Sequence, residues 1–275
     1  MVECWLPYGK TEVHISVPLK SLMGIAEIKA EVAPEPEKEI AASIQNPIDS
    51  KRLAELVAKG KRVALALEGD LPSPYIGFAA EQVITELLAA GITGQDISVI
   101  VSPSTTGTVR TNLHEQLKTL ERFEVKINQH SWSQGNVKQV SDWLINKDFL
   151  ETDLRIILGE VKPDPIAGYS GGSSILFPGL ADTGTIESRL RQTFSPESRF
   201  AVLEGNPVQA ASRDILNLVG VDFAVNIVSD PRGLPMKVFS GAPEKSWRSA
   251  VELAEKTYTT PIERGEAVVV SAGGY

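Results

Sequence analysis

Short apolar runs alternate with longer amphipathic segments through the middle of this 275-residue chain. Four short runs are typical of strands: RVALALEG and LRIILGE, which are apolar enough to be buried, and DISVIVSPS and FEVKINQH. The segments between the first three along the chain, YIGFAAEQVITELLAAG and VRTNLHEQLKTLE, have helical spacing. This alternation predicts an α/β fold with a mostly parallel sheet and helices on both faces.

The two ends of the chain carry other patterns. VECWL and TEVHISV flank a turn and predict an N-terminal hairpin in which Val13, Ile15 and Val17 share one face. We expect a surface connection over 27–47 and a helix over 49–60. Further along, the pattern predicts a helical region around 172–194, a helix from GNPVQAASRDILNLVG, a hairpin closed by PRG, a helix over 243–258 and a last strand AVVVSAGG. We expect one α/β domain over 1–275 with a C-terminal strand and helix extension, its weakest boundary near 195–200.

Composition narrows the class of protein. The chain is 42% hydrophobic, and its 27 basic and 35 acidic residues give a formal charge of −8, with the basic residues dispersed. No basic stripe is therefore available for nucleic acid, and we expect no nucleic-acid partner. The single cysteine, Cys4, excludes an internal disulfide or a zinc site built on cysteines. We also expect no signal peptide and no membrane span, which makes the cytoplasm the default location.

Loops at the carboxyl ends of parallel strands are the first places to look for a ligand site, because they converge at one edge of the sheet. Four loops qualify, EGDLPSPY, SPSTTGTVR, GEVKPDPIAGYSGGSS and the terminal AGGY. In the first, Glu68 and Asp70 can share a proton or bind a metal, or they can stabilise a turn, which the Leu-Pro-Ser-Pro context favours. The second loop can bind an anion through the hydroxyls and N–H groups of Ser102, Ser104, Thr105, Thr106 and Gly107. It can equally cap the helix that follows, and Thr108 before VRTNL suits that role.

The third loop is rich in glycine and serine, and its candidate ligand-binding residues are Ser170, Gly171, Gly172, Ser173 and Ser174. It fits neither a Walker A sequence nor a dinucleotide fingerprint, and it misses the nucleophile elbow by one position. None of the three histidines (His14, His114 and His130) has the spacing of a metal ligand, and we expect each at the surface or in a capping position. The glycines serve either a strand-to-helix turn or the docking of an acid or nucleotide on backbone N–H groups.

Several motifs of this chain, taken together, resemble those of a known family. LPYGK, NPIDSKRLAEL, AGYSGG followed by LFPGL, EGNPVQ, DFAVNIV and VFSGAPEKSWRSAVELA resemble the N-terminal domain of the nickel-pincer lactate racemase family over nearly the whole chain. AVVVSAGGY resembles the strand at which that family passes into its C-terminal domain, so the resemblance places that domain after Tyr275, outside this sequence.

The resemblance implies a definite chemistry. Members of the family carry a nickel pincer nucleotide tethered to a lysine, and a histidine completes the coordination of the nickel. Two further histidines act in turn as acid and base on the hydroxyl of a 2-hydroxy acid, while hydride moves to and from the cofactor.

The matching positions of this chain hold other residues. Ser174 stands at the position of the tether lysine and Ser173 at that of an arginine, while Val109 and Asp164 stand at those of the acid/base histidines. Leu190 or a neighbour occupies the position of the nickel histidine, and no histidine occurs after His130. We therefore expect no cofactor and a noncatalytic relative that binds a small anion, a nucleotide or a partner protein. The alternative is a racemase or epimerase that uses Asp164, Glu68 or Asp70 as acid or base, with a second domain closing the cleft.

Overall fold

A computed structural model describes residues 1–8, 11–26, 28, 30–69, 73–103, 111–133 and 135–270. The chain divides into two compact units, one formed by 1–29 with 259–275 and the other by 30–258.

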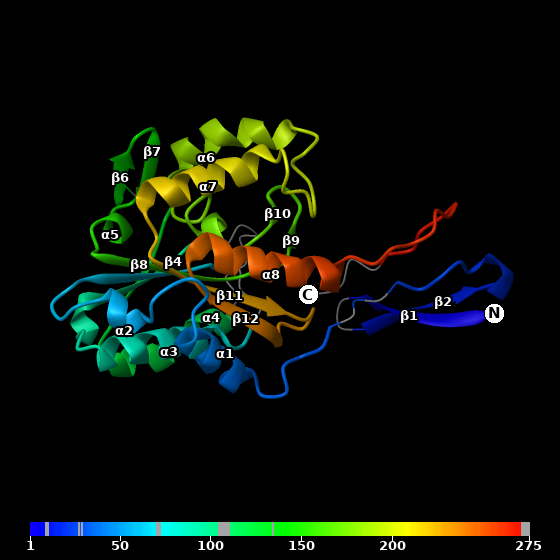
Figure 1. The fold of residues 1–275 in the computed structure, drawn as a ribbon. Helices are drawn as coiled ribbons and strands as arrows, with labels where there is room; N and C mark the ends of the chain where they lie inside the picture. Colours follow the sequence, from blue (N-terminus) through cyan, green and yellow to red (C-terminus); the bar gives the residue numbers. More distant parts are fainter. Residues whose placement is uncertain are drawn as a thin grey trace. The chain divides into compact units, whose positions relative to one another are not determined.

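The larger unit is built around a six-stranded sheet with the order β12-β11-β8-β3-β4-β5 (Figure 1). Its strands are β3 (Val63–Leu67), β4 (Ile97–Val101), β5 (Lys126–Gln129), β8 (Leu154–Glu160), β11 (Phe223–Ser229) and β12 (Pro235–Gly241). All neighbours are parallel except β11 and β12, which form an antiparallel pair. The mostly parallel α/β sheet and the late hairpin predicted from the sequence are confirmed.

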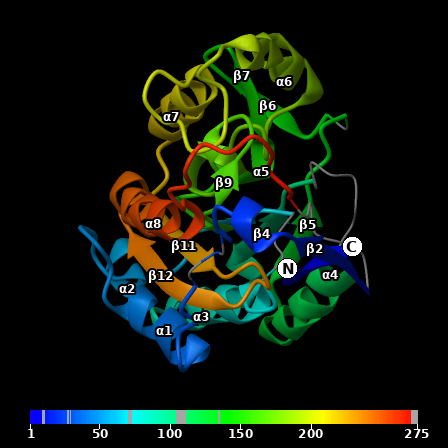
Figure 2. The same cartoon turned by 90° about the vertical axis from the view of Figure 1, so that its right-hand side faces the viewer.

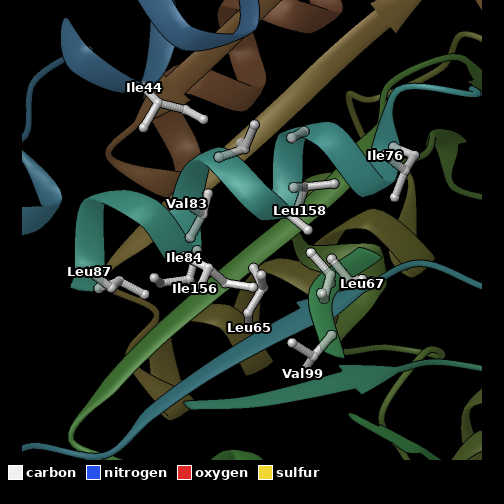
Figure 3. Packing of buried hydrophobic residues seen from close by; sticks show 14 of the residues in the cluster. Ile44, Leu65, Leu67, Ile76, Val83, Ile84, Leu87, Val99, Ile156 and Leu158 are labelled. Atoms are coloured by element: carbon white, nitrogen blue, oxygen red, sulfur yellow. The ribbon is translucent and has the colours of Figure 1, made fainter. Parts of the chain in front are cut away.

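Side chains alternate between the two faces of the central strand β3, and every residue of this strand is buried. Leu65 and Leu67 belong to a cluster with α3 (Ile76–Ala89), whose Val83 and Leu87 point toward the sheet (Figure 3). Ala64 and Ala66 pack on the opposite face, in a second cluster that includes residues of α7 (Pro207–Val219). A strand buried on both faces has no polar phase, which explains its continuous apolar sequence.

Helices cover both faces of the sheet (Figure 2). α1 (Pro36–Gln45), α2 (Leu53–Leu56), α3 and α4 (Thr111–Lys118) lie on one side. The other side carries α5 (Lys147–Leu150), α6 (Thr183–Leu190), α7 and α8 (Pro243–Tyr258). Trp247 and Ala250 of α8 pack with Val228 of β11 in a third apolar cluster.

Three expectations about local structure are wrong. The stretch 27–47 contains α1, whose Ile40 and Ile44 are one turn apart and buried, although the surrounding Glu, Lys and Pro suggested a surface connection. The helix expected over 49–60 shrinks to the single turn α2, because Arg52 and Val57 at its two ends are extended. Residues 267–270 form no strand and are exposed. The antiparallel pair β6 (Val137–Val140) and β7 (Trp143–Asn146) was not predicted.

The smaller unit contains the predicted N-terminal hairpin, in which β1 (Val2–Tyr8) pairs antiparallel with β2 (Thr11–Val17). The register places Cys4 opposite Ile15 and Leu6 opposite Val13. The apolar residues of β2 therefore share one face, as the alternating pattern predicts.

Candidate functional site at the carboxyl ends of the parallel strands

The loops that follow β3, β4 and β8 come together at the carboxyl edge of the sheet. The N–H of Gly69, after β3, donates to Oγ of Ser102, after β4, at 3.0 Å. A Cβ at Gly69 would lie 2.1 Å from the Ser102 carbonyl oxygen, so only glycine fits there. Oε2 of Glu68 accepts the N–H of Glu160, at the end of β8, at 3.4 Å. Three of the four candidate loops thus meet, as the topology predicts.

The glycine pair after β8 is required by backbone conformation and packing. Gly171 has φ 74° and Gly172 has φ 53°, in the region that side chains disfavour. A Cβ at Gly171 would lie 2.9 Å from the carbonyl oxygen of Glu160, and one at Gly172 would lie 2.6 Å from Cδ1 of Trp247. Indole Nε1 of Trp247 donates to the Ser170 carbonyl at 2.9 Å, which holds α8 against the loop. The turn accounts for both glycines without a ligand.

The side chains of Ser170 and Ser174 in this loop also have partners within the fold. Oγ of Ser170 donates to the Glu160 carbonyl at 2.8 Å and accepts the N–H of Lys162 at 3.2 Å. Oγ of Ser174 donates to the Gly171 carbonyl at 3.0 Å. Ser173 is buried within the 3-10 turn Gly172–Ile175, and its carbonyl accepts the N–H groups of Leu176 and Phe177. These bonds hold the loop closed on itself.

Asp164, the candidate acid or base, stabilises a turn. It lies in the short pair β9 (Pro163–Asp164) and β10 (Gly168–Tyr169). Its Oδ1 accepts the N–H of Ile166 at 2.8 Å and that of Ala167 at 2.6 Å. A carboxylate that accepts two backbone N–H groups is the usual partner of such a turn.

Three charged residues that the sequence did not mark as candidates, Glu160, Lys162 and Asp230, lie at the ends of β8 and β11. Glu160 is 2% exposed in its side chain, and its Oε2 lies 3.5 Å from Nζ of Lys162. The hydroxyl of Tyr258 donates to the carbonyl of Ser229. Burial raises the pKa of Tyr258, and the nearby carboxylates of Glu160 and Asp230 raise it further. The only signal in the sequence was the glutamate that closes LRIILGE; Tyr258 and Asp230 are brought there by tertiary structure.

His130 is buried rather than at the surface. Its Nδ1 contacts Nδ2 of Asn146 at 3.0 Å and its Nε2 contacts the Ala181 carbonyl at 2.9 Å. Burial lowers the pKa of His130, although the bond to Ala181 and the charge of Asp182 act in the opposite direction. The histidine ties together the segments that end β5, β7 and the turn before α6.

Several candidate residues lie outside the described residues: Asp70, Thr105, Thr106, Val109 and the terminal AGGY. Leu190 is the last residue of α6. Within the described part of the chain, no group of three or more histidine, cysteine, aspartate or glutamate side chains could hold a metal ion. No helix found there is long and apolar enough to cross a membrane.

The fold and the loops at this edge define an α/β protein with a mostly parallel sheet that is covered by helices on both faces. A family model, the lactate racemase N-terminal domain, matches residues 8–201, and this chain belongs to that family.

Two relatives match the whole chain. The lactate racemase of Thermoanaerobacterium thermosaccharolyticum is 25% identical over 288 residues, covering 100% of this chain and 67% of that protein. The lactate racemase of Lactiplantibacillus plantarum is 24% identical over 291 residues, covering 100% of this chain and 68% of that protein. The chain thus spans about two thirds of the length of these enzymes.

Solved structures agree on the fold. The lactate racemase apoprotein from T. thermosaccharolyticum has a TM-score of 0.77 at 22% identity, covering 93% of this chain and 63% of that chain. A protein from Thermotoga maritima has a TM-score of 0.58 at 16% identity, covering 80% of this chain and 59% of that chain.

Proposed function

We propose that this chain is a noncatalytic member of the lactate racemase N-terminal domain family that acts by binding a small anion, a nucleotide or a partner protein. The observation that carries the proposal is Ser174, which stands where the resemblance requires the tether lysine. Its hydroxyl donates a hydrogen bond to the carbonyl of Gly171 in the same turn. A serine has no amine with which to form that tether.

The other residues of the site do not fit the nickel pincer nucleotide either. Asp164, at an acid/base position, accepts two backbone N–H groups through Oδ1. The sequence holds no histidine after His130, so α6 supplies no imidazole for nickel. We therefore derive no reaction step through this cofactor.

Intact mass and nickel content test this proposal. The full chain is produced in a host that also makes the pincer-synthesis enzymes, with the T. thermosaccharolyticum lactate racemase produced in parallel as the positive control. We expect the mass calculated from the sequence and no stoichiometric nickel, while the control gains both the adduct and the metal. An adduct with stoichiometric nickel on this chain would overturn the proposal.

A thermal-shift screen tests the binding function. The probes are nicotinate mononucleotide and short 2-hydroxy acids, because a ligand that binds only the native state stabilises it by about 2.7 kcal/mol at a hundred times its Kd. A probe that docks on the glycine loop should lose its effect in Ser174→Glu and keep it in Ser249→Glu, a change at a half-buried serine of α8 whose Oγ donates to the Lys245 carbonyl. If no probe shifts the unfolding temperature, binding of these ligands at the loop is rejected and a partner protein remains.

A second candidate is a racemase with altered acid/base residues, and one contact favours it. Among the described candidate carboxylates, that of Glu68 lies at the carboxyl end of β8: its Oε2 accepts the N–H of Glu160 at 3.4 Å and lies 3.2 Å from where a Cβ of Gly159 would stand. This candidate requires interconversion of the enantiomers of a 2-hydroxy acid that Glu68→Gln abolishes. Such turnover would replace the noncatalytic proposal.

A further inference from the structure

Two buried carboxylates lie where β8 and β11 end, and their surroundings differ. Oδ1 of Asp230 accepts the N–H groups of Arg232 and Leu234, each at 2.9 Å, and its Oδ2 accepts Nε of Arg232 at 2.7 Å. The side chain of Glu160 is 2% exposed, and within the described part of the chain its one bond joins Oε2 to Nζ of Lys162 at 3.5 Å. Because a buried carboxylate ordinarily receives several donors, Glu160 can accept further hydrogen bonds.

A hydroxyl on the adjacent strand also lacks a partner. Ser229, the last residue of β11, is fully buried, and its Oγ has no hydrogen-bond partner among the residues that the structure describes. Its carbonyl, in contrast, accepts the hydroxyl of Tyr258. A buried hydroxyl without a partner costs free energy, and few such groups occur in a folded protein. An unpaired hydroxyl near an incompletely bonded carboxylate indicates a site for a polar ligand.

The strand register places these groups on one face of the sheet. Glu160 is paired with Ile227 in the parallel pair β8–β11. Ser229 follows Ile227 by two positions, and residues two apart in a strand point to the same side. Lys162 follows Glu160 by two positions, in a segment whose backbone pairing with β11 continues past the end of β8. The carboxylate, the amine and the hydroxyl are therefore neighbours at the carboxyl ends of these strands.

The charges of this cluster limit the chemistry of the ligand. A simple ammonium ion would be attracted by Glu160 but repelled by Lys162, and a simple carboxylate would meet the reverse. A small zwitterion satisfies both residues, because its ammonium group can bond to Glu160 and its carboxylate can bond to Lys162. The side chain of Lys162 is 38% exposed, so it can turn from Glu160 toward the ligand.

We propose that Glu160, Lys162 and Ser229 bind the zwitterion of a free amino acid. Its ammonium group donates to the Glu160 carboxylate and to Oγ of Ser229, and its carboxylate pairs with the Lys162 amine. This ligand belongs to a different class from the small anion, nucleotide or partner protein proposed above, and its site does not use the N–H groups of the glycine loop.

A thermal-shift screen of the standard amino acids on the full chain, followed by isothermal titration calorimetry, tests the proposal. Methylammonium and acetate are the controls that carry a single charge. We expect at least one amino acid to bind with a stoichiometry of one, and both controls to bind at least about tenfold more weakly, because each lacks one of the two charge-assisted contacts.

Three substitutions locate the ligand. Glu160→Gln and Lys162→Gln should each weaken binding by about tenfold or more, because each removes one charge. Ser229→Ala removes the unpartnered hydroxyl, so it should weaken binding without lowering the unfolding temperature of the free protein. Ser246→Ala is the matched control: Ser246 is equally buried, but its Oγ accepts Nδ2 of Asn226 at 3.0 Å. This control should lower the unfolding temperature and leave the affinity unchanged.

Four results would overturn the proposal. The first is that no amino acid binds, and the second is that methylammonium or acetate binds as tightly, which would indicate a site for a simple ion. The third is binding that is lost in Ser174→Glu but kept in Glu160→Gln, which would place the ligand on the glycine loop. The fourth is a Ser229→Ala variant of lower unfolding temperature and unchanged affinity, which would assign an ordered water to that hydroxyl. Lys162→Gln, at a half-exposed position, keeps the test decisive where Glu160→Gln does not fold.

Discussion

The two units of this protein use β-strands in opposite ways. Strand β3 of the 30–258 unit is buried on both faces, and its sequence VALAL is apolar throughout. Strand β2 of the smaller unit, TEVHISV, alternates polar and apolar residues and has no buried residue. A continuous apolar run signals a strand enclosed by its own chain, whereas strict alternation signals a face that something must cover. The larger unit therefore has an apolar core of its own, whereas none of the described residues of the smaller unit is buried.

Truncating a core side chain gives the largest expected contrast between the two units. Leu158→Ala removes a fully buried side chain from β8 and should lower the free energy of unfolding by about 3–5 kcal/mol. Val13→Ala in the hairpin should change it by less than about 0.5 kcal/mol. Urea unfolding followed by circular dichroism measures both values, and equal losses would contradict the division.

Gly172→Ala tests whether the glycine loop belongs to the interior of the larger unit. The new Cβ would meet Trp247 at 2.6 Å with φ at 53°, so we expect a loss of about 2–4 kcal/mol from strain and overpacking. Gly60→Ala is the matched control, because Gly60 has φ 81° but nothing within 4 Å, and it should lose about 1 kcal/mol. Combining Gly172→Ala with Trp247→Leu should recover part of the loss if the clash is its cause.

Arg155→Met probes the polar bonds inside the same unit. The guanidinium donates to the carbonyls of Phe149, Leu150, Thr152, Val219 and Gly220, and so joins the ends of α5 and α7. Its removal leaves these carbonyls without a charged donor, and we expect a loss of about 2–3 kcal/mol. Arg248→Met, on the exposed side of α8, should cost less than about 0.5 kcal/mol in the same chemical denaturation.

His130 should make the larger unit sensitive to mild acid. Because its pKa in the folded protein lies below the ordinary 6.5, the folded state binds this proton less readily than the unfolded state. The stabilisation is therefore complete above the unfolded pKa and is lost as the pH falls through the folded pKa. The unfolding temperature, measured from pH 7.5 down to about 5, should fall less steeply in His130→Gln than in the unaltered protein. Parallel profiles would show that His130 does not titrate on unfolding.

Ser174→Lys is expected to have the smallest effect on stability. It tests whether the glycine loop is closed or can still hold the cofactor. It replaces the hydroxyl bonded to Gly171 by an amine, with a loss of about 1 kcal/mol or less. Made together with the pincer-synthesis enzymes, this variant should still bind no nickel, because no histidine follows His130. A mass adduct on the variant alone would show that the loop still admits the cofactor.

Local patterns predicted much of the fold but not every helix. α8 was predicted at its observed bounds, since sixteen residues from Pro243 to Tyr258 keep one apolar stripe. α1 was missed because its short apolar stripe is set among charged residues and becomes clear only when Ile40 and Ile44 meet the core cluster. The opposite error was made at 49–60. The composition there favours a helix, but the backbone is extended at Arg52 and Val57, so only the single turn α2 forms.

The sequence predicted where the candidate site lies, but only partly what its residues do. The convergence of the loops after β3, β4 and β8 follows from parallel topology, and the structure confirms it for the described residues. That Gly172 must be glycine because of Trp247, 75 positions further along the chain, could not be read from either residue. Nor could the bond from Ala167 to Asp164, which turns a candidate acid or base into the anchor of a turn.

The α/β alternation, the amphipathic hairpin and the side chains present at each position of the site all follow from the amino-acid sequence, because periodicity and functional groups are local properties of a chain. The proximity of the Glu160 and Asp230 carboxylates to Tyr258, and the closing of the glycine loop against α8, arise from tertiary packing. Such contacts join segments far apart in sequence, and they form only when the packing of the whole sheet and its helices brings those segments within hydrogen-bonding or electrostatic range.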